Sequence, residues 1–303
     1  MTQAQPDAGE RTPTLSRRGF LKGAAVGLAA GAVASPLGFG AAPSETRRAW
    51  RCRLSTSSIH FKQLPVEQAC ERIAALGFEA IDLWSAYQEC RHLDDVLARL
   101  GPDGLGALLK KHQLKLYAFS CYVGGYRKYA ELLGQAGGGV AIQGSAGPCP
   151  PAELTARMRA FLEGLKPLAE LAEKHRSYLA IENHGDTLLS SLDSFKAFVD
   201  LNRSPRLGLA LAPYHLQAMG ASVEEAIGIC GQQLLFFYAW QKQPGVGQLP
   251  GHGPTDFTPW LRALARADYR WYVNPFMHGE IQPEAMSAAL AKARDYLKQC
   301  APT

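Results

Sequence analysis

The feature that most constrains the fold is a regular alternation of short apolar runs and helical patterns from residue 50 onward. Each run is five to nine residues long and is followed by a segment whose apolar residues recur at helical spacing. Helices between successive strands favour parallel pairing, because the chain must cross back over the sheet before the next strand. We predict strands at 52–59, 80–84, 114–122, 140–144, 178–183, 207–212, 234–240 and 271–275.

The helical segments complete eight strand-helix units. They are predicted at 65–76, 94–112, 126–133, 152–175, 192–201, 223–230, 259–267 and 283–299. Gly164 and Pro167 lie inside the fourth helix, where we expect a break or kink. Eight such units are the number of a closed parallel barrel, so the predicted fold is an α/β (β/α)8 TIM barrel over residues 50–300. A doubly wound open sheet is the alternative.

The N-terminal segment has the features of a targeting signal. Arg17 and Arg18 begin a twin-arginine export pattern, and residues 23–40 are uncharged and dominated by Ala and Gly. We predict a signal peptide over residues 1–34, cleaved near Ala34 or alternatively near Ala42, that is recognised by the twin-arginine export machinery. The mature protein would be periplasmic. A retained membrane anchor is the alternative.

Charge and cysteine usage narrow the classes of partner. The net charge of +5 falls to +3 without residues 1–34, which hold four basic and two acidic side chains. This small charge, without basic clusters, gives no reason to expect nucleic acid as a partner. The seven cysteines are widely spaced, so we predict free thiols and neither a disulfide framework nor a cysteine zinc site.

Polar and aromatic residues gather where the predicted strands end. In a barrel these ends converge on one face. Glu182 and His184 alternate with Asn183 along the fifth strand, so the first two point to the same side. The other strands supply His60, Asp82, Trp84, Tyr122, Gln143, Tyr214, His215, Tyr238, Trp240, Gln241, Asn274 and His278. Rings mixed with hydrogen-bonding groups suit a sugar, whose C–H faces stack while its hydroxyls need partners.

Other chemistries find less support. The sequence has no Gly-rich nucleotide-binding loop and no G-x-S-x-G motif, so hydride transfer and serine hydrolysis are disfavoured. The loop 241–256, which holds His252, is predicted to be either a lid or a surface connection. Asp82 could be a buried structural acid, and Asp256 a turn residue beside a core anchor, Phe257.

Three stretches resemble the xylose isomerase-like TIM barrels, a sugar phosphate isomerase/epimerase family: residues 179–184, 207–215 and 251–257. The resemblance implies a barrel, a small carbohydrate ligand, and one divalent cation held by Glu, Asp, His and Glu at the ends of strands five to eight. Glu182 matches the first ligand. The other three positions fall on Ala212, Tyr238 and Asn274, so the usual ligand set is not retained and the cofactor is left unknown.

Two interpretations of this site stay open. In one, Glu182, His184, His215 and His278 form a rebuilt metal centre. In the other, the site is metal-free, with Glu182 as the base and His184 or His215 as the acid or the group that polarises a carbonyl. Both use predicted substrate-binding residues from the strand ends and the loop: His60, Trp84, Tyr122, Gln143, Tyr238, Trp240, His252 and Asn274.

The predicted function is proton transfer next to a carbohydrate carbonyl, as in sugar isomerases and epimerases. A non-catalytic periplasmic sugar-binding protein descended from such enzymes is the alternative, because three ligand positions have changed. A zinc-dependent endonuclease with the same barrel would need more His and acidic ligands and a basic groove. The particular sugar and the oligomeric state do not follow from the sequence.

Overall fold

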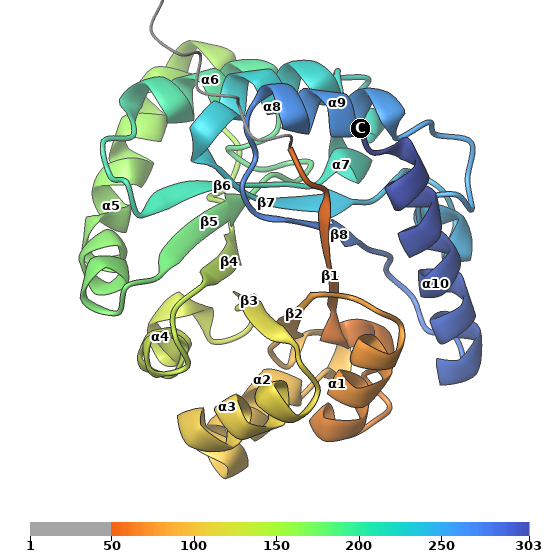
Figure 1. Ribbon diagram of the computed structural model, residues 1–303. Helices are drawn as coiled ribbons and strands as arrows, with labels where there is room; N and C mark the ends of the chain where they lie inside the picture. Colours follow the sequence, from red (N-terminus) through yellow and green to blue (C-terminus); the bar gives the residue numbers. More distant parts are fainter. Residues whose placement is uncertain (1–49, 303) are drawn as a thin grey trace, which may run out of the picture. The chain divides into compact units, whose positions relative to one another are not determined.

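A computed structural model describes residues 50–302, and in it eight parallel strands form a closed barrel surrounded by helices (Figure 1). Each strand pairs with its neighbours in sequence, and β1 closes the barrel on β8. The (β/α)8 prediction is therefore confirmed. The predicted signal peptide and its cleavage sites lie outside the described residues. The strands are β1 Arg53–Ser57, β2 Ala80–Trp84, β3 Lys115–Ser120, β4 Val140–Gly144, β5 Tyr178–Glu182, β6 Leu207–Leu211, β7 Leu234–Ala239 and β8 Tyr272–Pro275.

The helices lie outside the strands and follow the predicted order with two differences. The segment predicted as one helix at 94–112 consists of α2, a π-helical turn at Val96–Leu100, and α3, because Gly101 adopts a positive φ of 64°. The six-residue α7 was not predicted because it is too short to show a helical repeat. The helices are α1 Val66–Ala75, α2 His92–Asp95, α3 Gly101–Lys111, α4 Gly125–Gln135, α5 Leu154–Lys174, α6 Leu192–Leu201, α7 Pro213–Ala218, α8 Val223–Cys230, α9 Thr258–Arg266 and α10 Pro283–Cys300.

Helix α5 is not broken at Gly164 and Pro167, where the sequence predicted a break or a kink. It continues for 21 residues through both positions. Gly164 and Pro167 are exposed, whereas Leu162 and Leu165 are buried against the barrel. On the solvent side water can satisfy the carbonyl that proline leaves without a donor, and the buried side chains hold the helix in place.

The barrel interior is filled by side chains of unequal size. Small residues from four strands belong to the interior cluster, and aromatic rings, some of them from the same strands, occupy the remaining space. Tyr117 stacks on Phe236 with ring centroids 4.8 Å apart. The interior is therefore a packed core, and a ligand can enter only at the strand ends. The small inward residues are Ala80, Ala118, Ala180 and Ala210.

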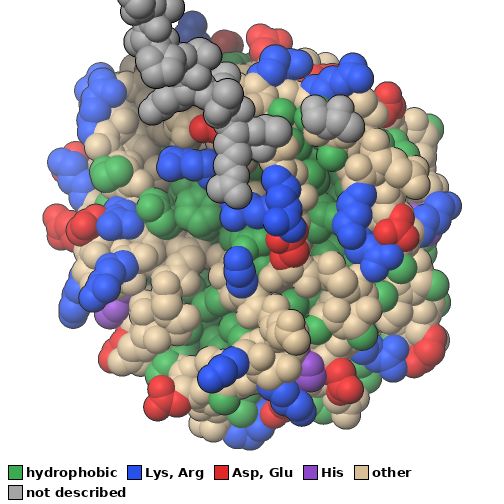
Figure 2. All heavy atoms as spheres, in the orientation of Figure 1, with side chains coloured by type: hydrophobic (Ala, Val, Ile, Leu, Met, Phe, Trp, Pro, Cys, Tyr) green, Lys and Arg blue, Asp and Glu red, His purple; other side chains and the backbone are tan. Residues whose placement is uncertain are grey.

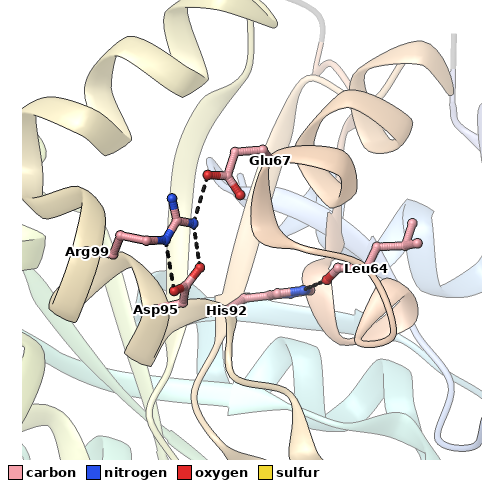
Figure 3. Close-up of polar contacts among 5 residues, drawn as sticks. All are labelled: Leu64, Glu67, His92, Asp95 and Arg99. Atoms are coloured by element: carbon pink, nitrogen blue, oxygen red, sulfur yellow. Dashed lines mark hydrogen bonds and ion pairs between the residues drawn. The ribbon is translucent and has the colours of Figure 1, made fainter.

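A second hydrophobic core lies between the strands and the surrounding helices. On the outer side of this core, Arg99 of the π-helical turn forms two ion pairs (Figure 3). Its Nη2 lies 2.8 Å from Oε1 of Glu67 in α1 and 2.6 Å from Oδ2 of Asp95 in α2. Beside them buried His92 contacts the Leu64 carbonyl oxygen at 2.8 Å, and burial lowers the pKa of His92. The exposed ion pairs contribute little to stability, so the apolar contacts hold these elements together.

Two further features bear on the sequence predictions: the distribution of charge on the surface and the state of the cysteines. On the face drawn in Figure 2, Lys and Arg side chains lie among Asp, Glu and hydrophobic side chains. The seven cysteines are free thiols, four of them buried. Within residues 50–302, we find no helix long and apolar enough to span a membrane.

Candidate functional site

A cavity of about 100 Å³ lies at the C-terminal ends of the strands. It brings together six residues that the sequence analysis singled out and two that it did not, Tyr87 and Phe276. The predicted six are Trp84, Tyr122, Glu182, His184, His215 and His278. They come from segments far apart in the chain, and only the closure of the barrel places them around one space.

The strand that carries Glu182 is fixed by its neighbour Asn183. The buried Asn183 amide accepts a hydrogen bond from the Ala212 backbone N–H at 2.6 Å and donates one to the Ala212 carbonyl at 3.2 Å. This pair of bonds fastens the end of β5 to the end of β6. The side chain of Glu182, the last residue of β5, is thereby held in the cavity wall.

Two tyrosines form a hydrogen-bonded chain to Glu182. Tyr122 O–H donates to Glu182 Oε2 at 2.7 Å, and the hydroxyl oxygens of Tyr122 and Tyr238 are 3.0 Å apart. Because the single hydroxyl proton of Tyr122 is used on Glu182, Tyr238 is the donor to Tyr122. Burial raises the pKa of Glu182 to about 7, although the bond from Tyr122 lowers it. Near neutral pH this carboxyl can therefore both take and give a proton.

Three histidine rings face the same cavity. The ring centroids of His184 and His215 are 3.9 Å apart, and the His278 ring lies 4.9 Å from the ring of Phe276. Burial, together with the neighbouring His184, lowers the pKa of His215 to about 3 and that of His278 to about 4. Both rings are therefore neutral at neutral pH, and a neutral imidazole can donate an N–H to a carbonyl oxygen.

Asp82 lies beneath the cavity and orients one of its walls. Its carboxylate accepts hydrogen bonds from Ser57 at 2.7 Å, Trp84 Nε1 at 2.6 Å and Ser120 at 3.0 Å. Burial raises the pKa of Asp82 to about 6, and these donors lower it. The carboxylate fixes the Trp84 ring in the cavity wall, which matches the structural role considered for Asp82.

Six predicted substrate-binding residues lie outside the cavity lining. Asn274 is buried and bonded to Ser55 and Ser57, both at 2.9 Å. His60 Nε2 accepts from the Met277 backbone N–H at 3.3 Å. His252 lies against α10, 3.0 Å from the Ala289 carbonyl oxygen. The six are His60, Gln143, Tyr238, Trp240, His252 and Asn274, of which Tyr238 reaches the site through Tyr122.

The loop 241–256 supports the cavity without lining it. Buried Gln248 uses its whole amide group: Oε1 accepts from Trp240 Nε1 at 2.7 Å and from the His278 N–H at 3.1 Å. Its Nε2 donates to the carbonyls of His278 at 2.8 Å and Gly245 at 3.1 Å. The loop thus positions His278. Its end also matches the prediction for Asp256, whose Oδ1 accepts from the Thr258 N–H at 2.8 Å.

The two residues missed by the sequence analysis are both aromatic. Tyr87 belongs to a short turn after β2 in which Gln88 and Glu89 have positive φ values of 49° and 69°. Phe276 directly follows β8 and stacks on Trp84 with centroids 5.3 Å apart. Phe276 is apolar and so does not belong to the polar residues at the strand ends, although its place directly after a strand is a usable signal.

The residues at the four positions of the usual metal site do not fit a divalent cation. Ala212 offers no ligand atom in its side chain, and the hydroxyl of Tyr238 bonds to Tyr122. Both amide atoms of Asn274 are engaged with serines. Throughout residues 50–302, we find no three His, Cys, Asp or Glu side chains placed to hold a metal ion. The rebuilt centre of Glu182 and three histidines is therefore not supported by the geometry.

The fold and the cavity define a (β/α)8 barrel with a carboxylate, histidines and aromatic rings at its mouth. The xylose isomerase-like TIM barrel family model matches residues 70–300, and the chain belongs to this family. No curated protein matches the sequence. The barrel is similar to a D-psicose 3-epimerase from Clostridium cellulolyticum H10 at 14% identity and a TM-score of 0.67, covering 83% of this chain and 100% of that one.

Other solved structures share the barrel at similarly low identity. A 3-keto-D-glucoside 4-epimerase from E. coli has 14% identity and a TM-score of 0.64, covering 81% of this chain and 100% of that one. A probable 3-DHS dehydratase from Bacillus anthracis has 16% identity and a TM-score of 0.64, covering 80% of this chain and 97% of that one. Such likenesses establish the fold, and the chemistry must be argued from the cavity.

Proposed function

We propose that this protein is a sugar isomerase or epimerase that moves a proton on a carbon next to a carbohydrate carbonyl. The observation that carries the proposal is the cavity carboxyl of Glu182, whose pKa is raised to about 7, facing histidines that are neutral at that pH. The similar structures named as sugar epimerases support a carbohydrate ligand.

The reaction divides between the carboxylate and the imidazoles. Glu182 takes a proton from the carbon beside the carbonyl, and the electron pair of that C–H bond forms an enediolate. A neutral N–H of His215 or His278 donates to the developing oxyanion. For isomerisation, Glu182 then returns the proton to the former carbonyl carbon, while the proton of the neighbouring hydroxyl passes to the former carbonyl oxygen. For epimerisation, the first carbon must receive a proton on its opposite face from a second cavity group, and His184 is the candidate donor. Tyr122 holds the carboxylate throughout, and Trp84 and Tyr87 offer ring faces to the sugar C–H groups.

A second candidate is a sugar-binding protein without catalytic activity. It is favoured by the replacement of three family metal positions by Ala212, Tyr238 and Asn274. A carboxylate and aromatic rings would then serve only to bind hydroxyls and C–H faces. In this second candidate the protein binds a carbohydrate but does not catalyse proton transfer.

The two candidates are separated by proton exchange. The full chain is incubated with a panel of ketoses in deuterated water, and deuterium at the carbon beside the carbonyl is measured by NMR. We expect exchange by the native protein, its loss in Glu182→Gln, and its retention in Glu163→Gln, a matched change on the exposed side of α5. Sugar binding without exchange would support the second candidate, and absence of both would contradict each.

We also propose export through the twin-arginine pathway, on the evidence of Arg17 and Arg18. Cell fractionation of the full chain should place the native protein in the periplasm and an Arg17→Lys, Arg18→Lys variant in the cytoplasm. Equal periplasmic amounts of the two would contradict this proposal.

A further inference from the structure

We infer that the cavity selects uncharged sugars and amino sugars, and rejects sugars that carry a phosphate or a carboxylate. This inference rests on the proposed carbohydrate ligand and adds the charge class of that ligand. The inference follows from two observations: carboxyl groups lie at or behind the cavity wall, and lysine and arginine side chains are absent from the lining.

The cavity wall offers a negative group and no positive one. Its eight lining residues include Glu182 and neither lysine nor arginine. A second carboxylate, Asp82, lies directly behind the wall and accepts a hydrogen bond from Trp84 at 2.6 Å. Burial keeps His215 and His278 uncharged at neutral pH. A bound anion would therefore face Glu182, which is partly ionised at neutral pH, and the carboxylate of Asp82, without a counter-charge in the lining.

Three lysines near the mouth lie outside the cavity lining, and two of them are paired with other groups. Lys62 Nζ lies 3.0 Å from Glu280 and 3.1 Å from the carbonyl of Gln88, the residue after Tyr87 in the rim turn. Lys128, on the first turn of α4, is paired with Asp94 at 2.5 Å. Lys242 follows β7 and is exposed, outside the lining. None of these cations faces the cavity.

Acceptor atoms and ring faces dominate what the cavity does offer. Within residues 50–302, Glu182 Oε1 has no hydrogen-bond partner and neither has the buried Nδ1 of His278. The carboxylate oxygen binds O–H and N–H donors, and the imidazole nitrogen accepts or donates a hydrogen bond according to its tautomer. The faces of Trp84, Tyr87 and Tyr122 favour an ammonium group over an anion, because the π-electrons are negative. A phosphate would lose its hydration and gain no charged partner.

Binding of a matched ketose series tests this selection. Calorimetry on the full chain compares D-fructose, 1-amino-1-deoxy-D-fructose, D-fructose 1-phosphate and D-fructose 6-phosphate at neutral pH. We expect the amino sugar to bind at least as tightly as fructose, and both phosphates to bind on the order of tenfold or more weakly. Using both phosphate positions separates rejection of the charge from a steric effect at one end of the sugar.

The variant Glu182→Gln tests whether the carboxylate causes the selection. It should narrow the gap between fructose and its phosphates and remove any advantage of the amino sugar. Glu163→Gln, which removes an equal charge far from the mouth, should leave both ratios unchanged. A thermal melt of each variant verifies that it is folded.

The outcomes separate this inference from the proposed function. Phosphates that bind as tightly as fructose would overturn the inference and leave the proposed function standing. The expected binding order without proton exchange would overturn only the catalytic proposal. If none of the four ligands bound and no ketose of the panel bound or exchanged, both would be overturned.

Discussion

Removing the Tyr122 hydroxyl should shift the pH at which the site becomes active. In Tyr122→Phe the Glu182 carboxylate loses the hydrogen bond that it accepts at 2.7 Å. A hydrogen bond to a charged group is worth about 1.5–3 kcal/mol, and one pKa unit corresponds to about 1.36 kcal/mol. Because the bond favours the ionised form, its loss should raise the pKa of Glu182 from about 7 by roughly one to two units.

The assay is the pH dependence of kcat/KM for deuterium exchange into a ketose. The acid limb reports the pKa of the base in the free protein. We expect this limb to move upward by roughly one to two units in Tyr122→Phe, so that activity falls at pH 7 and recovers by about pH 9. Tyr238→Phe should move the limb less, since Tyr238 reaches Glu182 only through Tyr122.

The reasoning would be refuted by one particular pattern. If Tyr122→Phe lowered kcat/KM equally at every pH and left the acid limb in place, Tyr122 would act on the substrate and not on the carboxylate. A downward shift of the limb would contradict the sign of the argument.

Three further predictions follow from the same contacts. Burial raises the pKa of Glu182 from 4.5 to about 7, so the native protein loses stability as pH rises through about 7. In urea unfolding at pH 9, Glu182→Gln should therefore be more stable than the native chain by about 1–2 kcal/mol. Below about pH 4.5 the two unfolding free energies should agree. Gln248→Ala leaves Trp240 Nε1 and the His278 backbone without their hydrogen-bond partner. The free energy of unfolding should therefore fall by about 2–4 kcal/mol. The exposed control Gln135→Ala should change the free energy of unfolding by less than about 0.5 kcal/mol. Chelator treatment or added Mn²⁺ should leave the exchange rate unchanged, and a strict metal requirement would contradict our interpretation of the metal positions.

The fold was predictable because the strands and helices of a barrel have recognisable local sequence patterns. The runs at 80–84 and 140–144 coincide with β2 and β4, and the helical spacing at 192–201 coincides with α6. The break expected in α5 was wrong because proline propensity is local, while the burial of Leu162 and Leu165 that holds the helix is tertiary. The local sequence pattern therefore predicted the order of the strands and helices, but it did not predict that helix α5 continues through Pro167.

The site was predictable in its location more than in its composition. Glu182 and His184 share a strand face, which alternation alone shows. His60 and Asn274 also stand at strand ends, yet their partners, Met277 and Ser55, are distant in sequence and keep them out of the cavity. Whether a strand-end side chain faces a ligand or a neighbouring strand depends on those long-range contacts.

The most direct test of the central claim is the rate of deuterium exchange into a ketose by Glu182→Gln, measured beside the native chain and Glu163→Gln from pH 5 to 9. Our account predicts that exchange by the native chain and by Glu163→Gln rises through a midpoint near pH 7, as Glu182 ionises, and that Glu182→Gln shows none at any pH. Exchange by Glu182→Gln at the native rate would contradict the account.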